Sequence, residues 1–379
     1  MHIAVLCDEN IAYLPPVLSL LAGLNRLGQE VTLITRDASC LADEQLGTGD
    51  LHIQEYGVWG AQGYLKGVKN VLDSQRFVRS YLREHRGAFD VVWAASDMSA
   101  RMAGKELAAF RYVIQLHELV EHVPLATRHK MPLESKELIK LARSAWKVVV
   151  PEYNRAYIQA SYWDLPAIPF VLPNKPAYAQ PESGELPEEY RAAYDAIAGE
   201  ECSVLLYQGA FGNDRDLEPY ARALEQLDDR YMLYLMGPDV GEENHRNIER
   251  VRAYPHVRYL GYVKPPHHLS FTAHADIGLM PYAPTALSYY SKLNALYCAP
   301  NKIWEYTQHG VPILATDVPG IHQVFASEKI GLTIADTELA TICDALTTIE
   351  ARYDEMSANA QRYYASIDYD QLLAQVLEL

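Results

Sequence analysis

Two cations and one carboxylate in the second half of the sequence have the types and spacing to bind a ligand that contains a diphosphate. Lys302 and Glu305 lie three residues apart, so a helix would place them on one face. Arg215 follows the glycines Gly209 and Gly212 at an expected helix start. Glycine lets the backbone approach an anion closely, free N–H groups at a helix N-terminus attract negative charge, and a guanidinium group is a two-pronged donor. The pattern predicts that Arg215 and Lys302 clamp a diphosphate.

Other readings of the charged residues are simpler. Arg215 is flanked by Asp214 and Asp216, so the alternative to a phosphate contact is an ordinary surface ion pair. His117 follows an apolar run and is either a helper at a reacting group or a hydrogen-bonded histidine at a strand end. In the segment HELVEH, His117 and His122 lie five residues apart, whereas the zinc motif HExxH places its histidines four apart. No metal site is predicted.

The elements that must hold these residues can be predicted from the apolar runs. Short apolar runs alternate with helical patterns in the first half, and the alternation restarts in the second half. Such alternation is typical of parallel strands covered by helices. The predicted fold class is therefore α/β, with two Rossmann-like domains. The expected strands are 3–7, 31–35, 89–95, 111–116, 147–151 and 168–172 in the first half, and 203–210, 231–237, 257–263, 276–282 and 312–317 in the second.

A proline-rich stretch separates the two halves. From Pro173 the chain reads PNKPAYAQPESGELPEEY, which holds four prolines and no apolar periodicity. This composition is typical of a linker. We therefore expect domains at 1–172 and 201–353, joined by a linker at 173–200. The tail at 354–379 is expected to form helices that pack back on the first domain.

Charge and composition disfavour several classes of function. The formal net charge of -16 is a poor match for nucleic acid. Five scattered cysteines with no CxxC pair argue against a disulfide framework and a zinc cage, and they favour a reducing compartment. The apolar run at the N-terminus is followed at once by Asp8 and Glu9, so we expect a first strand there and no signal peptide. No apolar run approaches the roughly 18 residues of a membrane span, and we expect a cytoplasmic protein.

One basic segment contrasts with this acidic total. Residues 128–147 carry six Lys and Arg against two Glu, together with an apolar side. A basic amphipathic surface favours peripheral contact with anionic lipid at the inner face of the membrane. The alternative is an ordinary solvated helix that covers the sheet.

Five sequence blocks follow one another through the second half: YQGAFGNDRDLEPY, YMLYLMGP, VRYLGYV, HADIGLMPY and PNKIWEYTQHGVPILATDVPG. In this order they resemble the nucleotide-binding domain of retaining GT-B glycosyltransferases, the group 1 or family-four-like enzymes. The resemblance implies two Rossmann-like domains facing across a cleft, the first binding the acceptor. It also implies transfer of a sugar from a UDP, GDP or dTDP donor to a glycan, lipid-linked or small-molecule acceptor. Retention of configuration, without a metal or other cofactor, is expected.

The resemblance also implies roles for individual residues. Glu305 matches the carboxylate that binds the ribose hydroxyls of the donor. Arg215 and Lys302 match the basic residues that hold the diphosphate, and His117 matches a first-domain histidine near the transferred sugar. Further donor-side positions are Gly209, Gly237, Tyr262, Val263 and Asn301, and the acceptor-side candidates are Glu9, Asn10 and Tyr13.

Three positions depart from the family pattern. Tyr297 lies eight residues before Glu305, where members commonly carry a glutamate beside the donor sugar. Ala210 replaces the usual first phosphate-binding arginine, and DENIAYLPP replaces a glycine pair after the first strand. These departures leave the sugar and the acceptor open. Two alternatives also remain: a nucleotide-sugar epimerase on the same scaffold, and a non-catalytic partner subunit that binds nucleotide sugars. A dinucleotide oxidoreductase is disfavoured, since no GxGxxG follows an expected strand.

Overall fold

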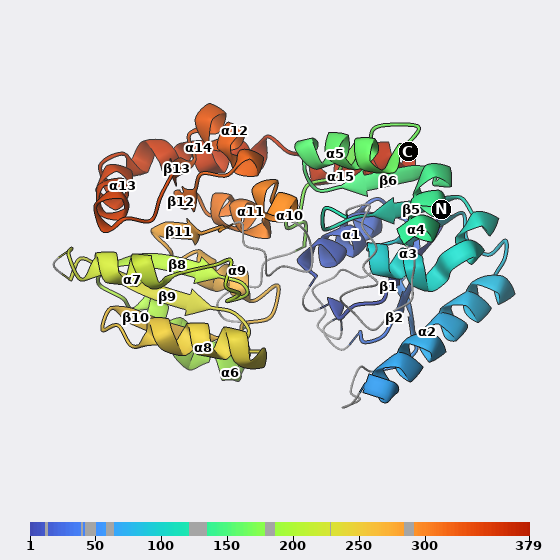
Figure 1. Cartoon of the computed structure of the whole chain (residues 1–379), viewed down its shortest axis with the longest axis horizontal. Helices are drawn as coiled ribbons and strands as arrows, with labels where there is room; N and C mark the ends of the chain where they lie inside the picture. The colour runs from blue at the N-terminus through green and yellow to red at the C-terminus, as the bar shows by residue number, and fades with distance from the viewer. Residues whose placement is uncertain are drawn as a thin grey trace. The chain divides into compact units, whose positions relative to one another are not determined.

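Two structural units divide the chain between them. The first unit comprises Met1–Tyr178 and Tyr369–Leu379, and the second comprises Ala179–Asp368. The structure is a computed structural model (Figure 1). It describes residues 1–11, 14–38, 41, 51–57, 64–120, 135–178, 186–227, 229–283 and 292–379.

The first unit is built on one parallel sheet. Within its described residues the sheet has seven strands in the order β3-β2-β1-β4-β5-β6-β7. The strands are β1 (His2–Cys7), β2 (Glu30–Thr35), β3 (Leu51–Glu55), β4 (Val91–Ala94), β5 (Tyr112–Gln115), β6 (Lys147–Val150) and β7 (Phe170–Val171). The helices are α1 (Pro15–Arg26), α2 (Tyr64–Glu84), α3 (Asp97–Ala103), η4 (Gly104–Ala109), α4 (Ser135–Ser144), α5 (Tyr153–Trp163) and α15 (Tyr369–Leu377).

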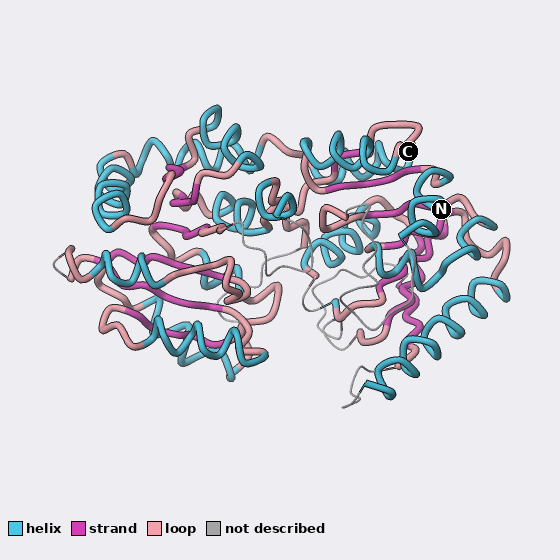
Figure 2. The backbone as a smooth tube through the Cα atoms, viewed as in Figure 1, coloured by secondary structure: helices cyan, strands magenta, loops and turns pink. Residues whose placement is uncertain are grey.

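The second unit repeats this plan. In the part of the chain that is described, its parallel sheet has the order β10-β9-β8-β11-β12-β13. The strands are β8 (Ser203–Gln208), β9 (Tyr231–Met236), β10 (Val257–Gly261), β11 (Ile277–Met280), β12 (Ile313–Thr316) and β13 (Gly331–Ile334). The helices are α6 (Glu188–Ala198), α7 (Glu218–Leu224), α8 (Gly241–Arg252), α9 (His268–Thr272), α10 (Lys292–Leu296), α11 (Asn301–Gln308), α12 (Pro319–Glu328), α13 (Leu339–Ala351) and α14 (Tyr353–Ala365). Figure 2 shows helices flanking the strands in each unit.

Burial along strand β8 explains why its middle residues, 204–207, are all apolar. Leu206 packs in one buried cluster, and its neighbours Leu205 and Tyr207 pack in another. Successive side chains of a strand point to opposite faces, so both faces of the second sheet are covered. A parallel strand covered on both faces reads as a continuous apolar run. Each run predicted as a strand from the sequence forms a strand of one of these sheets.

The tail of the chain contributes helices to both units. Helix α14 packs on α11 in the second unit, where the rings of Trp304 and Tyr363 stack with centroids 4.8 Å apart. Helix α15 packs on α1 in the first unit. There Asp370 accepts two hydrogen bonds from Arg26, at 2.6 and 2.7 Å. Gly23 of α1 lets the helices come close, because a Cβ at that position would lie 2.8 Å from Leu373 Cδ2.

Candidate functional site

The strand order of the second sheet reverses between β8 and β11, which are neighbours although two strands separate them in the sequence. In open α/β sheets, ligands bind outside the carboxyl ends of the strands at such a point. Glycines follow β8 and β9 at this edge. A Cβ at Gly237 would lie 2.0 Å from the carbonyl oxygen of Gly209, and Gly209 itself has φ 128°. The close backbone approach therefore requires glycine at both positions.

Arg215 and Lys302 both lie at this edge. Arg215 follows β8, and its Cζ lies 4.0 Å from the ring centroid of Tyr282, which follows β11. Lys302, in the first turn of α11, places its Nζ 5.7 Å from the same centroid and 5.1 Å from that of Tyr207. The fold thus brings the two predicted cations to one tyrosine from elements far apart in the sequence.

The surroundings of the two cations differ. Burial and, after it, the positive charge of Arg215 lower the pKa of Lys302, which is about 8 although Glu305 acts in the opposite direction. Arg215 forms an ion pair with Asp214, and both side chains are partly buried. Asp216 instead accepts a hydrogen bond from Arg250 at 2.8 Å.

Among the residues that the structure describes, no group of three or more His, Cys, Asp or Glu side chains is arranged to hold a metal ion.

Glu305 is a buried carboxylate with two donors. Only 4% of the residue is exposed. Gln208 donates from Nε2 to Oε2 at 2.5 Å, and His268 Nε2 lies 3.2 Å from Oε1. Burial acts to raise the pKa of the carboxyl, but His268, Gln208 and Lys302 outweigh it and hold that pKa below its ordinary value. Glu305 is therefore negatively charged at neutral pH, beside the positive charge of Lys302.

The remaining donor-side candidates lie at the same strand ends or near them. Asn301 is the first residue of α11 and is half-buried. Tyr262 follows β10 and is half-buried as well. Val263 is buried and belongs to the apolar core, so its side chain packs against the protein.

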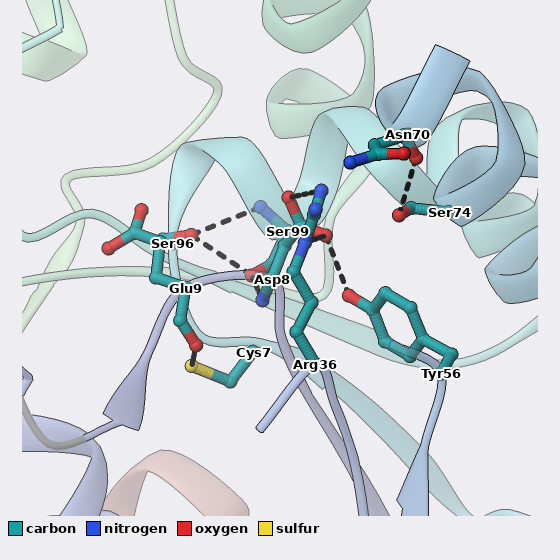
Figure 3. Close-up of polar contacts among 9 residues, drawn as sticks. All are labelled: Cys7, Asp8, Glu9, Arg36, Tyr56, Asn70, Ser74, Ser96 and Ser99. Carbon is teal, nitrogen blue, oxygen red and sulfur yellow. Dashed lines mark hydrogen bonds and ion pairs between the residues drawn. The ribbon is translucent and has the colours of Figure 1, made fainter. Parts of the chain in front are cut away.

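The first sheet has an equivalent edge, between β1 and β4 (Figure 3). Asp8, just after β1, accepts hydrogen bonds from Arg36 at 2.8 and 3.0 Å and from the hydroxyl of Tyr56 at 2.6 Å. Its backbone N–H donates to Ser99 at 3.0 Å. Burial raises the pKa of the Asp8 carboxyl, although Arg36 and Tyr56 oppose the shift. The carboxyl ends of β1, β2 and β3 are thus tied together by buried polar contacts.

Glu9 follows Asp8, and its side chain extends away from Arg36 in Figure 3. Burial, followed by the neighbouring carboxyl of Asp97, raises the pKa of Glu9 to about 7. Of the other acceptor-side candidates, Asn10 is described and half-buried, whereas Tyr13 lies outside the described residues. Glu9 therefore changes its charge near neutral pH.

His117 follows β5 and has a defined tautomer. Its Nε2 lies 2.6 Å from the carbonyl oxygen of Ala95, which can only accept, so Nε2 carries a proton. Nδ1 is buried and has no hydrogen-bond partner among the described residues. Burial lowers the pKa of His117 to about 4. The ring is neutral at neutral pH and offers Nδ1 as an acceptor.

The basic segment 128–147 is described only in part, because residues 128–134 lie outside the described residues. In α4 the apolar side chains, among them Leu138 and Leu141, are buried in the first unit. Lys136 and Lys140 are exposed. A lipid surface would therefore meet basic side chains here and no apolar face. None of the described helices is both long and apolar enough to cross a membrane.

Two residues of the site carry no motif signal in the sequence. Gln208 ends a strand and His268 begins a short helix, and a polar residue at such a place is common. Their partner Glu305 lies 97 and 37 residues away along the chain. Only knowledge of which distant residues contact one another in the folded chain would have identified them.

Comparisons with known proteins agree with this architecture. Residues 202–351 match the family described as glycosyl transferases, group 1. Sucrose-phosphate synthase from Thermosynechococcus elongatus has a TM-score of 0.68 and 16% identity, covering 100% of this chain and 98% of its own. HepE of Anabaena, solved in complex with UDP, has a TM-score of 0.69 and 14% identity, covering 100% of this chain and 99% of its own. No curated protein matches the chain significantly. The GT-B fold predicted from the sequence, with two Rossmann-like domains, is confirmed.

Proposed function

We propose that this chain, whose residues 202–351 match the group 1 glycosyl transferases, transfers a hexosyl group from a nucleotide-sugar donor to an acceptor hydroxyl. The resemblance read from five sequence blocks is confirmed, because the family match spans all five. One observation carries the proposal. Two cations and a charged, buried carboxylate meet at the edge where the second sheet reverses its strand order.

The second unit supplies the donor site in this proposal. Arg215 and Lys302 hold the diphosphate, whose negative charge grows as the sugar departs. The lack of a side chain at Gly209 leaves the space beside Lys302 Nζ open to a phosphate oxygen, because a Cβ there would lie 3.0 Å from that nitrogen. Glu305 accepts hydrogen bonds from the ribose hydroxyls, and Tyr262 and Asn301 line the nucleotide. The complex of Anabaena HepE with UDP supports UDP as the first nucleotide to test, before GDP and dTDP.

The first unit supplies the acceptor site. His117 is neutral, so its Nδ1 accepts a hydrogen bond from a sugar hydroxyl. Glu9, Asn10 and Tyr13 contact the acceptor, a glycan, a lipid-linked sugar or a small molecule. A cytoplasmic location suits the scattered cysteines.

The proposed step proceeds with retention and without a metal. The acceptor oxygen forms a bond to the anomeric carbon on the face from which the diphosphate leaves. The bond from that carbon to the diphosphate oxygen breaks, and the acceptor proton passes to the departing phosphate. Arg215 and Lys302 stabilise the charge on the leaving group, and removal of one such contact typically costs about 3 to 4 kcal/mol of barrier.

Nucleotide binding tests this assignment most directly. Isothermal calorimetry with UDP, GDP and dTDP should show that Glu305→Ala and Arg215→Ala each weaken the binding of the preferred nucleotide at least about tenfold, since each removes a hydrogen bond to a charged group. Arg250→Ala is a matched control, because this exposed arginine binds Asp216 and Glu218. Unchanged nucleotide binding in both site variants would overturn the assignment.

A further inference from the structure

We propose that Gln208 and His268 are positioning residues that aim Glu305 at the two ribose hydroxyls, so that the site selects ribonucleotides over 2′-deoxyribonucleotides. The inference rests on the proposed function, in which Glu305 contacts the ribose. It names three residues, Gln208, His268 and Thr272, for which the sequence analysis predicted no role.

The four side chains form one buried network drawn from three elements. Glu305 lies in α11, Gln208 ends β8, and α9 begins with His268 and ends with Thr272. All four residues are buried, with Thr272 fully so. Two elements, β8 and α9, thus bring donors to one carboxylate on a third element, α11.

The orientation of the Gln208 amide follows from its partners. Thr272 Oγ1 lies 2.8 Å from Gln208 Oε1, and Gln208 Nε2 lies 2.5 Å from Glu305 Oε2. A charged carboxylate only accepts hydrogen bonds, so the NH₂ group must face Glu305. The amide oxygen then faces Thr272, whose hydroxyl can donate to it. A reversed amide would set two acceptor oxygens against each other and is excluded by the chemistry.

His268 holds the second oxygen of the carboxylate. Its Nε2 lies 3.2 Å from Glu305 Oε1, and because that oxygen accepts, Nε2 carries a proton. Its Nδ1 has no hydrogen-bond partner among the described residues, so the contact with Glu305 is the one that orients the ring there. With Gln208 on one oxygen and His268 on the other, the plane of the carboxylate is fixed.

A fixed carboxylate can distinguish a diol from a single hydroxyl. Each carboxylate oxygen has two lone pairs, and the network uses one on each oxygen. The two that remain can accept one hydrogen bond from each of the 2′ and 3′ hydroxyls. A 2′-deoxyribose leaves one buried acceptor without a donor, which is the situation in which binding sites reject an analogue most strongly.

The test compares UDP with 2′-deoxy-UDP by isothermal calorimetry. The wild-type protein should bind UDP at least about tenfold more tightly, because a lost hydrogen bond to a charged group has about that effect. Glu305→Ala should abolish the preference. His268→Ala and Gln208→Ala should each reduce it severalfold, chiefly by weakening UDP binding. His268→Gln, which keeps a donor, should restore most of it.

Matched variants separate positioning from general damage to the fold. His274→Ala removes a half-buried histidine two residues beyond α9 that contacts Tyr194, and it should keep the preference for UDP. Thr272→Val keeps the shape of the side chain but frees the Gln208 amide, so a partial loss of preference is expected even if an alanine variant fails to fold. A general loosening of the site would instead weaken UDP and 2′-deoxy-UDP equally.

Two outcomes separate the inference from the proposed function. If Glu305→Ala abolishes the preference but the variants of Gln208, His268 and Thr272 all retain it, the positioning role is wrong and the proposed function stands. If Glu305→Ala leaves UDP binding and the preference unchanged, Glu305 does not contact the ribose, and the proposed nucleotide site itself is wrong when Arg215→Ala also leaves UDP binding unchanged. Should wild type not bind UDP, GDP and 2′-deoxy-GDP replace the pair. Binding of dTDP but of neither UDP nor GDP overturns this inference, and binding of none of the three overturns the proposed function.

Discussion

Lys302 is held in surroundings that disfavour its own charge. Burial and the neighbouring Arg215 both lower its pKa, and the carboxylates of Glu305 and Asp214 do not compensate. Glu305 has the opposite relation to its surroundings, because its partners favour the charged form. The site therefore has a fixed negative group at one end, a lysine whose charge would gain from an added anion, and an arginine already paired with Asp214. This charge pattern suits a diphosphate attached to a ribose.

The charge of Lys302 predicts how nucleotide binding depends on pH. The ammonium form attracts the diphosphate, and it is lost as the pH rises through about 8. Affinity for UDP should therefore be constant at lower pH and fall above about pH 8, by up to about tenfold as the cationic contact is lost. Calorimetry between pH 7 and 10 measures this fall in the affinity for UDP.

Lys302→Arg provides the control for this pH dependence. Arginine stays charged throughout this range, so the variant should show no fall above pH 8. An identical fall in Lys302→Arg and in wild type would assign the titration to another group.

At the scale of elements, a buried ion pair aligns β1, which leads into Glu9, with the neighbouring strands. Asp8, Arg36 and Tyr56 follow β1, β2 and β3, and their contacts tie these strands at their carboxyl ends (Figure 3). The raised pKa of Asp8 indicates that its interaction with Arg36 does not fully offset the burial of its charge. The Asp8–Arg36 pair therefore fixes the relative positions of the strand ends more than it stabilises the fold.

Removing one member of this pair should be costly. Arg36→Met leaves the Asp8 carboxylate buried without its cation, and the free energy of unfolding should fall by about 3 to 5 kcal/mol. Urea unfolding followed by circular dichroism measures the loss. The double variant Asp8→Leu/Arg36→Met removes both charges and should recover most of the stability. A double variant as unstable as the single one would show that the ion pair itself stabilises the fold.

At the scale of the whole molecule, the chain returns to its first unit after completing the second. Helix α15 packs on α1, so the first unit contains residues that follow the second unit in the sequence. Leu373 of α15 is fully buried and lies beside Gly23. The stability of the first unit therefore depends on the far end of the sequence.

Leu373→Ala tests this dependence. The substitution leaves a cavity between α15 and α1 and should destabilise the first unit by about 2 to 5 kcal/mol. Differential scanning calorimetry should show a lower melting temperature, with UDP binding to the second unit retained at temperatures below the transition. Leu379→Ala changes a leucine that is 56% exposed and should have little effect. Equal effects of the two variants would argue against a bracing role for α15.

The sequence predicted the interior of both sheets but missed two edges. Every strand that is apolar along its length was predicted. β3 was missed because its residues are mostly exposed and its sequence, LHIQE, lacks an apolar run. β13 was missed because glycine and threonine interrupt its sequence, GLTI, and two of its residues are only half-buried. Both strands lie at the ends of their sheets, where a strand has one paired neighbour and less need of apolar side chains.

The sequence by itself determined the class of this protein: two parallel sheets covered by helices, and a cation and a carboxylate spaced for one helix face. These properties are local, because periodicity, glycine and the spacing along a helix act over a few residues. Tertiary structure alone decided what surrounds them. It brought Arg215 and Lys302 to Tyr282, and it placed Gln208 and His268 on Glu305. Hydrogen bonds and charges act through space, so partners distant along the chain become visible only when the chain is folded.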